Sequence, residues 1–153
     1  MNAKIDETKQ KLLAPCSLYC GVCGFFVAYR ENDRGLKEKM AKFYGCSPEE
    51  VVCEGCFSDK RFKHCEVCAI RACASEKNIE GCHRCEEFPC RLIDDFSQPI
   101  AKKFILEGVP ARKRLGKEKW VEEEENRYRC SKCGTIFFRG ASYCTQCQIE
   151  IKG

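Results

Sequence analysis

The stretch CSLYCGVC, from Cys16 to Cys23, places three cysteines in eight residues with C-x3-C-x2-C spacing. Radical S-adenosylmethionine enzymes bind a catalytic [4Fe–4S] cluster with this spacing, and half of a zinc site can have it too. The residues after Cys23 show no alternation of strands and helices, and a radical-enzyme barrel needs on the order of 200 residues or more. The stretch therefore favours a metal site without radical chemistry.

Cysteine dominates the composition, with 16 residues in a chain of 153. So many cysteines indicate a scaffold held by disulfides or by metal ions. The N-terminal residues show no apolar run of signal-peptide length, so we expect a cytoplasmic protein without a membrane span, in which paired cysteines bind metal. Repeated C-x2-C pairs agree, because a two-residue gap lets both sulfurs face one ion. The six pairs are Cys20/Cys23, Cys53/Cys56, Cys65/Cys68, Cys82/Cys85, Cys130/Cys133 and Cys144/Cys147.

The C-terminal block, YRCSKCGTIFFRGASYCTQCQIEI, contains two of these pairs separated by ten residues. Thr135 to Phe138 are strand formers, and Arg139 to Ser142 can form a turn. We therefore predict a zinc ribbon, in which a β-hairpin binds one tetrahedral ion. The expected ligands are Cys130, Cys133, Cys144 and Cys147.

The first cysteine block, residues 16–90, has twelve cysteines, enough for three tetrahedral sites. The simplest partition follows the sequence, although interleaved sets are equally tetrahedral. The sequential sets are Cys16, Cys20, Cys23 and Cys46, then Cys53, Cys56, Cys65 and Cys68, then Cys73, Cys82, Cys85 and Cys90. We thus predict about four zinc ions per chain, with an iron–sulfur cluster in the first block as the alternative. His64 and His83 adjoin cysteines and can replace a thiol, although a surface histidine is the simpler interpretation.

The segments between cysteines predict helices. Residues 24–45 have helical apolar spacing, and Ser47-Pro48-Glu49-Glu50 has the residues of a helix start. The cysteine-free connector is expected to be helical, with a break near Gly108-Val109-Pro110. The predicted fold is a small metal-stapled protein, with an α-rich irregular N-terminal module and a C-terminal β-hairpin zinc ribbon joined by a helical connector. The predicted units are a cysteine-rich zinc-binding domain at 1–97, the connector at 98–127 and the ribbon at 128–153.

Three motifs of the first block resemble those of a prokaryotic family known as domain of unknown function 3795. They are the opening at Cys16–Cys23, the stretch IRACA at Ile70–Ala74 and CHRCEEFPC at Cys82–Cys90. Gly116 to Trp120 and the C-terminal cysteines are similar to those of some members, so the likeness spans residues 13–150. Ser17 stands where the resemblance implies glycine, which leaves the thiols intact. The resemblance implies a cysteine-rich metal-binding protein and supplies no catalytic residues.

The charge pattern argues against a uniformly basic nucleic-acid binder. The formal charge is +4, and each Zn²⁺ with four ionised cysteines adds a centre of about −2. A weak RNA- or DNA-binding surface on the basic connector and the ribbon, with Arg112, Lys113 and Arg114 as candidate contacts, is one alternative. With no Ser/His/Asp set, phosphate-binding glycine loop or H-E-x-x-H pair, we expect no enzyme. The sequence thus predicts a zinc-binding adaptor module with structural four-cysteine sites and an unknown protein partner, and an iron–sulfur redox protein is the other alternative.

Overall fold

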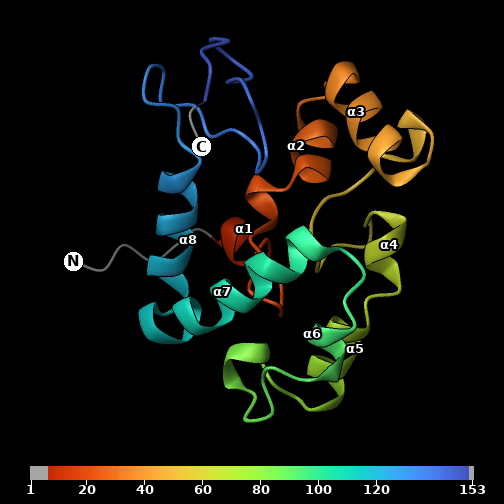
Figure 1. The fold of residues 1–153 in the computed structure, drawn as a ribbon, viewed down its shortest axis with the longest axis vertical. Helices are drawn as coiled ribbons and strands as arrows, with labels where there is room; N and C mark the ends of the chain where they lie inside the picture. The colour runs from red at the N-terminus through yellow and green to blue at the C-terminus, as the bar shows by residue number, and fades with distance from the viewer. Residues whose placement is uncertain (1–6, 152–153) are drawn as a thin grey trace.

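The computed structural model describes residues 7–151, which form short helices joined by turns. The helices, with 3-10 turns labelled η, are α1 (Glu7–Gln10), η1 (Cys20–Val22), α2 (Gly24–Arg30), α3 (Arg34–Tyr44), η2 (Pro48–Glu50), α4 (Lys63–Glu66), α5 (Ala69–Glu76), η3 (Cys82–Arg84), α6 (Arg91–Asp94), α7 (Pro99–Leu115) and α8 (Lys117–Arg127). Figure 1 shows the C-terminal segment, in blue, beside α2, while α7 crosses the middle of the molecule. No helix in this part of the chain combines the length and apolar character that a membrane span requires.

The apolar run at residues 24–45 forms two helices. After α2, Asn32 adopts a left-handed backbone with a φ of 49°. Asp33 then caps α3, because its Oδ1 accepts a hydrogen bond from the backbone N–H of Leu36 at 3.0 Å. The helix start predicted at Ser47 is confirmed, since its backbone N–H donates to Glu50 Oε2 at 2.7 Å in a capping box.

The connector is helical, but the predicted break near residues 108–110 is wrong. α7 continues through Pro110, and the helix is interrupted at Gly116, whose φ of 85° favours glycine. Proline removes one backbone hydrogen bond from α7. Burial of Ile105 and Val109, each at most 2% exposed, offsets that loss. Tertiary packing therefore overrides the local preference of proline.

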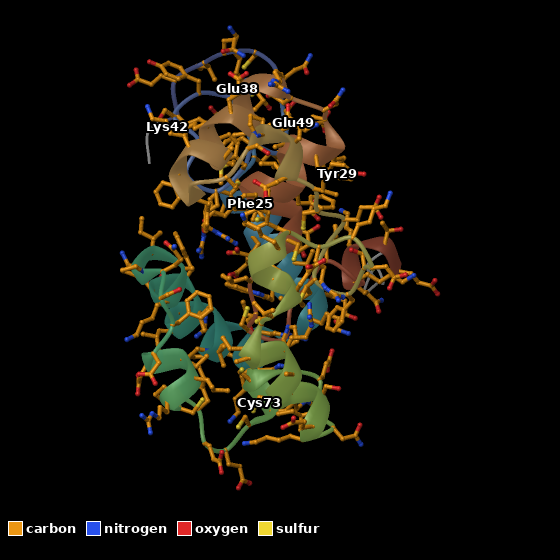
Figure 2. The ribbon with its side chains drawn as sticks, turned by 90° about the vertical axis from the view of Figure 1, so that its right-hand side faces the viewer. Phe25, Tyr29, Glu38, Lys42, Glu49 and Cys73 are labelled. Carbon is orange, nitrogen blue, oxygen red and sulfur yellow. The ribbon has the colours of Figure 1, made fainter. Side chains whose placement is uncertain are left out.

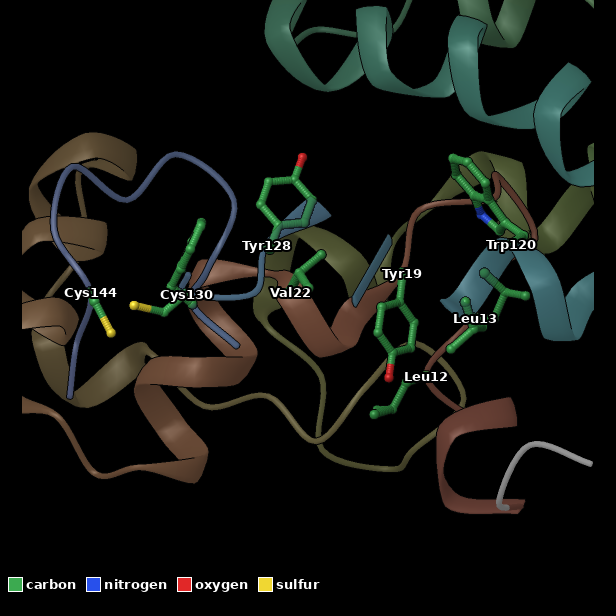
Figure 3. Close-up of a cluster of buried hydrophobic side chains, with 10 residues drawn as sticks. Leu12, Leu13, Tyr19, Val22, Trp120, Tyr128, Cys130 and Cys144 are labelled. Atoms are coloured by element: carbon green, nitrogen blue, oxygen red, sulfur yellow. The ribbon is translucent and has the colours of Figure 1, made fainter. Parts of the chain in front are cut away.

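Three clusters of buried side chains hold the helices together. Core A joins the N-terminal turn to α8 and the C-terminal segment, and it includes Leu13, Tyr19, Trp120 and Tyr128 (Figure 3). Core B surrounds Phe25, whose ring stacks on that of Phe62 with centroids 4.0 Å apart. Core C includes Ile70 of α5, Ile93 of α6 and Ile105 of α7. Core A contains residues from all three predicted units, and the division into units stays a prediction.

The predicted C-terminal β-hairpin is wrong, and with it the predicted fold class. Within residues 7–151 the structure has isolated β-bridges but no strand or sheet. Arg129 pairs with Ile136, and Tyr143 pairs with Glu150. Each cysteine pair therefore closes its own turn, and the two turns do not pair with each other as strands of a ribbon.

The segment between the two turns packs inward, which explains the missing strands. Phe137 is part of core A, and the next residue, Phe138, is part of core B. The backbone N–H of Arg139 donates to the carbonyl oxygen of Val22 at 2.7 Å. Residues with strand propensity thus contact the first cysteine block. Burial of the two aromatic rings there stabilises this packed arrangement more than the backbone hydrogen bonds of a β-hairpin would.

Ser17 occupies a conformation that favours glycine. Its φ is 70°, its side chain is 1% exposed, and its Oγ has no hydrogen-bond partner among the described residues. The left-handed region costs a residue with a Cβ about 1–2 kcal/mol. This strain gives a physical reason for the glycine that the family resemblance implies at this position.

We predict that Ser17→Gly stabilises the metal-loaded protein by about 1 kcal/mol, because it removes both the backbone strain and a buried hydroxyl without a partner. The midpoint of urea unfolding measures this change. The matched control is Ser75→Gly on the exposed side of α5, which should lower stability by about 0.5–1 kcal/mol. A loss of stability in both variants would contradict the strain at Ser17.

Candidate metal centres

The two C-terminal cysteine pairs sit on turns of the same construction. In the first, the backbone N–H of Gly134 donates to the carbonyl oxygen of Cys130 at 2.9 Å, and Gly134 has a φ of 77°. In the second, the N–H of Gln148 donates to the carbonyl oxygen of Cys144 at 3.0 Å, and Gln148 has a φ of 62°. A left-handed residue after each C-x2-C pair turns the chain back, so that both thiols of the pair point to the same side.

The four thiols of these turns converge. The Sγ atoms of Cys130, Cys133, Cys144 and Cys147, the C-terminal four-cysteine group, all lie within 4.8 Å of one another. Two Sγ–Sγ distances, Cys130 to Cys147 and Cys133 to Cys144, are 3.6 Å. A tetrahedral ion with bonds of about 2.3 Å separates its sulfurs by about 3.8 Å. The group therefore has the dimensions of a site for one metal ion.

Hydrogen bonds to the sulfurs favour thiolates in the first turn. The backbone N–H of Cys133 is the largest cause that lowers the pKa of Cys130. The hydroxyl and then the backbone N–H of Thr135 lower the pKa of Cys133 to about 6. Because metals bind the thiolate, these hydrogen bonds favour the charge state that metal binding requires at Cys130 and Cys133.

Core A encloses one side of the C-terminal four-cysteine group. Cys144 is fully buried and Cys130 is 4% exposed, whereas Cys133 is exposed. Figure 3 shows Cys130 and Cys144 side by side at the edge of the core, near Tyr128. The site is therefore continuous with the hydrophobic packing and also accessible from solvent.

Cys16 of the first block lies near cysteines that belong to other sequential sets. It is buried in core C, against which Cys56, Cys68 and Cys82 also pack. Burial is the main cause that raises the pKa of Cys16 to about 12, and the thiols of Cys56, Cys68 and Cys82 raise it further. The structure thus brings Cys16 close to members of the second and third predicted sets.

A second group of first-block thiols lies at core B. Cys53 is buried there, and Cys23 and Cys46 pack against the same core. Burial raises the pKa of Cys20, followed by the nearby thiols of Cys23 and Cys56. Burial and then the thiols of Cys23 and Cys53 raise the pKa of Cys65. These neighbours cross the sequential partition, in agreement with the interleaved alternative, and the assignment of ligands to ions stays a prediction.

The third predicted set does lie together. Cys73 of α5, Cys82, Cys85 and Cys90 line one cavity of about 190 Å³. Burial raises the pKa of Cys82 to about 11, and the thiols of Cys90, Cys85 and Cys73 add to this effect. Figure 2 shows Cys73 at the end of the molecule opposite to Glu38.

Of the two histidines, the structure describes the side-chain contacts of His83. His83 lies against a carboxylate, with its Nε2 3.6 Å from Glu80 Oε2. Burial, and then the charge of Arg112, lowers the pKa of His83 to about 4. The side chain of His64 lies outside what the structure describes. Whether either histidine binds metal stays a prediction.

Arg112 has a role that sequence reasoning missed. Only 2% of its side chain is exposed, and its guanidinium donates to the carbonyl oxygen of Ala14 at 3.0 Å and pairs with Glu80 at 3.2 Å. Lys117 also pairs with Glu80, at 2.6 Å. Arg112 therefore links α7 to the loop before Cys16. No local sequence signal separates it from the basic residues that follow it.

Arg112, Lys113 and Arg114 of the connector are the named contacts of the nucleic-acid hypothesis, which also includes the ribbon. Because Arg112 is buried, only Lys113 and Arg114 are exposed for contact with phosphates. The hypothesis stays a prediction for these two residues. A loss of RNA binding on substitution of Arg112 would report the fold and not a contact.

The fold and the thiol geometry define a helical, cysteine-rich protein in which four thiols could hold a metal ion. The family model described as protein of unknown function (DUF3795) matches residues 12–95. The match covers more than half of the chain, so the chain belongs to this family. It includes the whole first block and ends before the connector. Comparisons with curated proteins and with solved structures gave no match.

We predict that Arg112→Ala destabilises the metal-loaded protein by about 2–3 kcal/mol, because it removes a buried side chain together with its hydrogen bond to Ala14 and its ion pair with Glu80. Lys113→Ala, at the exposed neighbouring position, should change stability by less than about 0.5 kcal/mol. The shift in the urea midpoint measures both. Equal effects of the two substitutions would show that the Arg112 contacts do not stabilise the fold.

Proposed function

We propose that this protein is a zinc-binding adaptor whose tetrathiolate sites are structural. The observation that carries the proposal is the convergence of the four Sγ atoms of the C-terminal four-cysteine group within 4.8 Å. Four thiolates fill the coordination shell of a tetrahedral ion and leave no position for water or substrate. Such a site stabilises a fold and does not by itself catalyse a reaction.

Zinc suits these four ligands for a physical reason. Tetrahedral sites of four thiolates select zinc or iron among biological metals. Zinc has no redox chemistry and no geometric preference of its own, so it accepts the geometry that the two turns provide. Two distances between sulfurs of different turns, Cys130 to Cys147 and Cys133 to Cys144, are 3.6 Å, close to those of such a site.

Binding at this group supports the surrounding packing. The segment between the turns carries Phe137 into core A and Phe138 into core B. An ion that joins the two turns fixes both ends of this segment. Structural zinc sites contribute on the order of 10 kcal/mol of coupled binding and folding free energy, which is more than the net stability of many small domains.

The proposal extends to the first block and to partners. We propose further thiolate-bound metal there, to a total of about four metal centres per chain. The third sequential set holds one of these centres, and cysteines that cross the first and second sets hold the others. The metal-held fold then presents a surface to an unknown protein partner. No catalytic residue is part of the proposal.

We predict that Cys144→Ser removes about one zinc ion per chain from the purified protein. Cys144 is fully buried, with its Sγ 3.6 Å from that of Cys133, so the loss of this thiol opens the site. Metal analysis by inductively coupled plasma mass spectrometry measures the change. Gln146→Ala, an exposed change within the same turn, is the control and should keep the zinc content of the wild type.

The same comparison can contradict the proposal. Unchanged zinc in Cys144→Ser would show that the C-terminal four-cysteine group does not hold zinc. The protein could instead contain iron that is lost in Cys144→Ser and kept in Gln146→Ala. This result would show that the C-terminal four-cysteine group is a metal site but that its metal is iron and not zinc.

A further inference from the structure

One cavity of the structure has four cysteines in its lining. It has a volume of about 190 Å³, and Cys73, Cys82, Cys85 and Cys90 are part of its lining. Three of these thiols come from one loop with C-x2-C-x4-C spacing, and Cys73 comes from α5. Three ligands on a short loop and one at a distance are a known arrangement in iron–sulfur proteins.

This arrangement differs from the C-terminal four-cysteine group. In that group the four sulfurs converge closely, and two pairs of sulfurs from different turns are 3.6 Å apart. At the cavity, the four cysteines form part of the lining of a volume that far exceeds that of a single ion. A cubane cluster needs such a volume, because each thiolate binds a different iron and the iron and sulfide core fills the centre.

We propose that the cavity lined by Cys73, Cys82, Cys85 and Cys90 binds a [4Fe–4S] cluster. The four thiolates each bind one iron, and no iron is left for a substrate. The proposal deepens the metal-binding function above, and it replaces zinc by a cluster at this site alone. It rests on the chain being a metal-binding protein and leaves zinc at the C-terminal four-cysteine group.

Part of the remaining cavity wall is apolar, which suits a cluster. Ile70 and Ile93, at 4% and 0% exposed, belong to core C and line the cavity together with Phe88. An apolar wall limits water at the cluster, and solvent exposure is one of the factors that set its potential. Core C thus forms one side of the site.

A cation lies beside one of the four sulfurs. The Lys77 ammonium donates to Cys85 Sγ at 3.6 Å and pairs with Glu87 at 2.6 Å. A hydrogen bond and a positive charge at a ligand sulfur stabilise the reduced cluster, which carries one more electron. Lys77 is therefore a positioning residue that tunes the cluster and is not a ligand.

The test begins with the full-length protein, purified without oxygen and incubated with ferric iron, sulfide and an excess of a thiol. The thiol reduces half of the ferric iron, so that the cluster forms with two ferric and two ferrous ions. We expect about four iron and four sulfide ions per chain. We also expect a broad absorption in the visible range and an electron paramagnetic resonance signal after dithionite supplies one electron per cluster. A colourless protein that keeps zinc and takes up no sulfide would overturn the cluster and leave the zinc proposal intact.

Two substitutions separate the sites. Cys90→Ser should lose most of the bound iron and sulfide and keep the zinc of the C-terminal four-cysteine group. Cys144→Ser should lose that zinc and keep the cluster. Iron and sulfide that stay unchanged in Cys90→Ser would place the cluster elsewhere and overturn the assignment.

Two further variants test the site without removing a ligand, and they decide the matter if Cys90→Ser fails to fold. Lys77→Met removes the donor at Cys85 and should shift the midpoint potential of the cluster to more negative values. Glu87→Gln removes the negative charge beside Lys77 and should shift it the opposite way. Potentials equal to that of the wild type in both variants would overturn the placement of the cluster in this cavity.

Discussion

The buried carbonyl oxygens of the loop before Cys20 are the constraint on which the rest of the structure depends. The loop forms no extended helix or sheet that would satisfy them, and a buried carbonyl without a partner is costly. Within the loop, the backbone N–H of Ser17 donates to Ala14 at 2.9 Å. Distant donors supply further hydrogen bonds: Arg112 to Ala14 at 3.0 Å, the backbone N–H of Cys82 to Pro15 at 2.9 Å and the indole of Trp120 to Ser17 at 2.8 Å. One loop thereby fixes α7, η3 and α8 around Cys16.

This constraint also explains a close approach of two backbones. Gly81 lies against Pro15, where a Cβ would meet the carbonyl oxygen of Pro15 at 2.5 Å. Only glycine fits without a shift of the backbone. The contact brings Cys82 next to Cys16, although the two residues are far apart in sequence. Thiols from different motifs therefore meet because the backbone of the loop requires partners, and not because their own spacing specifies it.

The sequence predicts what depends on local chemistry. The capping box at Ser47, the helical connector and the shared direction of the two sulfurs in each C-terminal C-x2-C pair are consequences of neighbouring residues, and the family followed from motifs of the first block. The β-hairpin failed because the fate of Phe137 and Phe138 depends on cores A and B, which other parts of the chain build. Local propensity cannot show such packing. For the same reason Arg112 was indistinguishable from its exposed neighbour Lys113.

The candidate centres differ in how much of the fold they need. The C-terminal four-cysteine group spans only residues 130–147, so little chain entropy opposes its closure. The first-block thiols that lie near one another come from segments farther apart in sequence, such as Cys16 and Cys82, so more chain entropy opposes their closure. If metal binds first where closure is easiest, the C-terminal site fixes Phe137 and Phe138, and these rings then complete cores A and B. Cys53, Cys23 and Cys46 lie at core B, so the order of assembly would run from the local site to the distributed ones, with hydrophobic packing as the link between them.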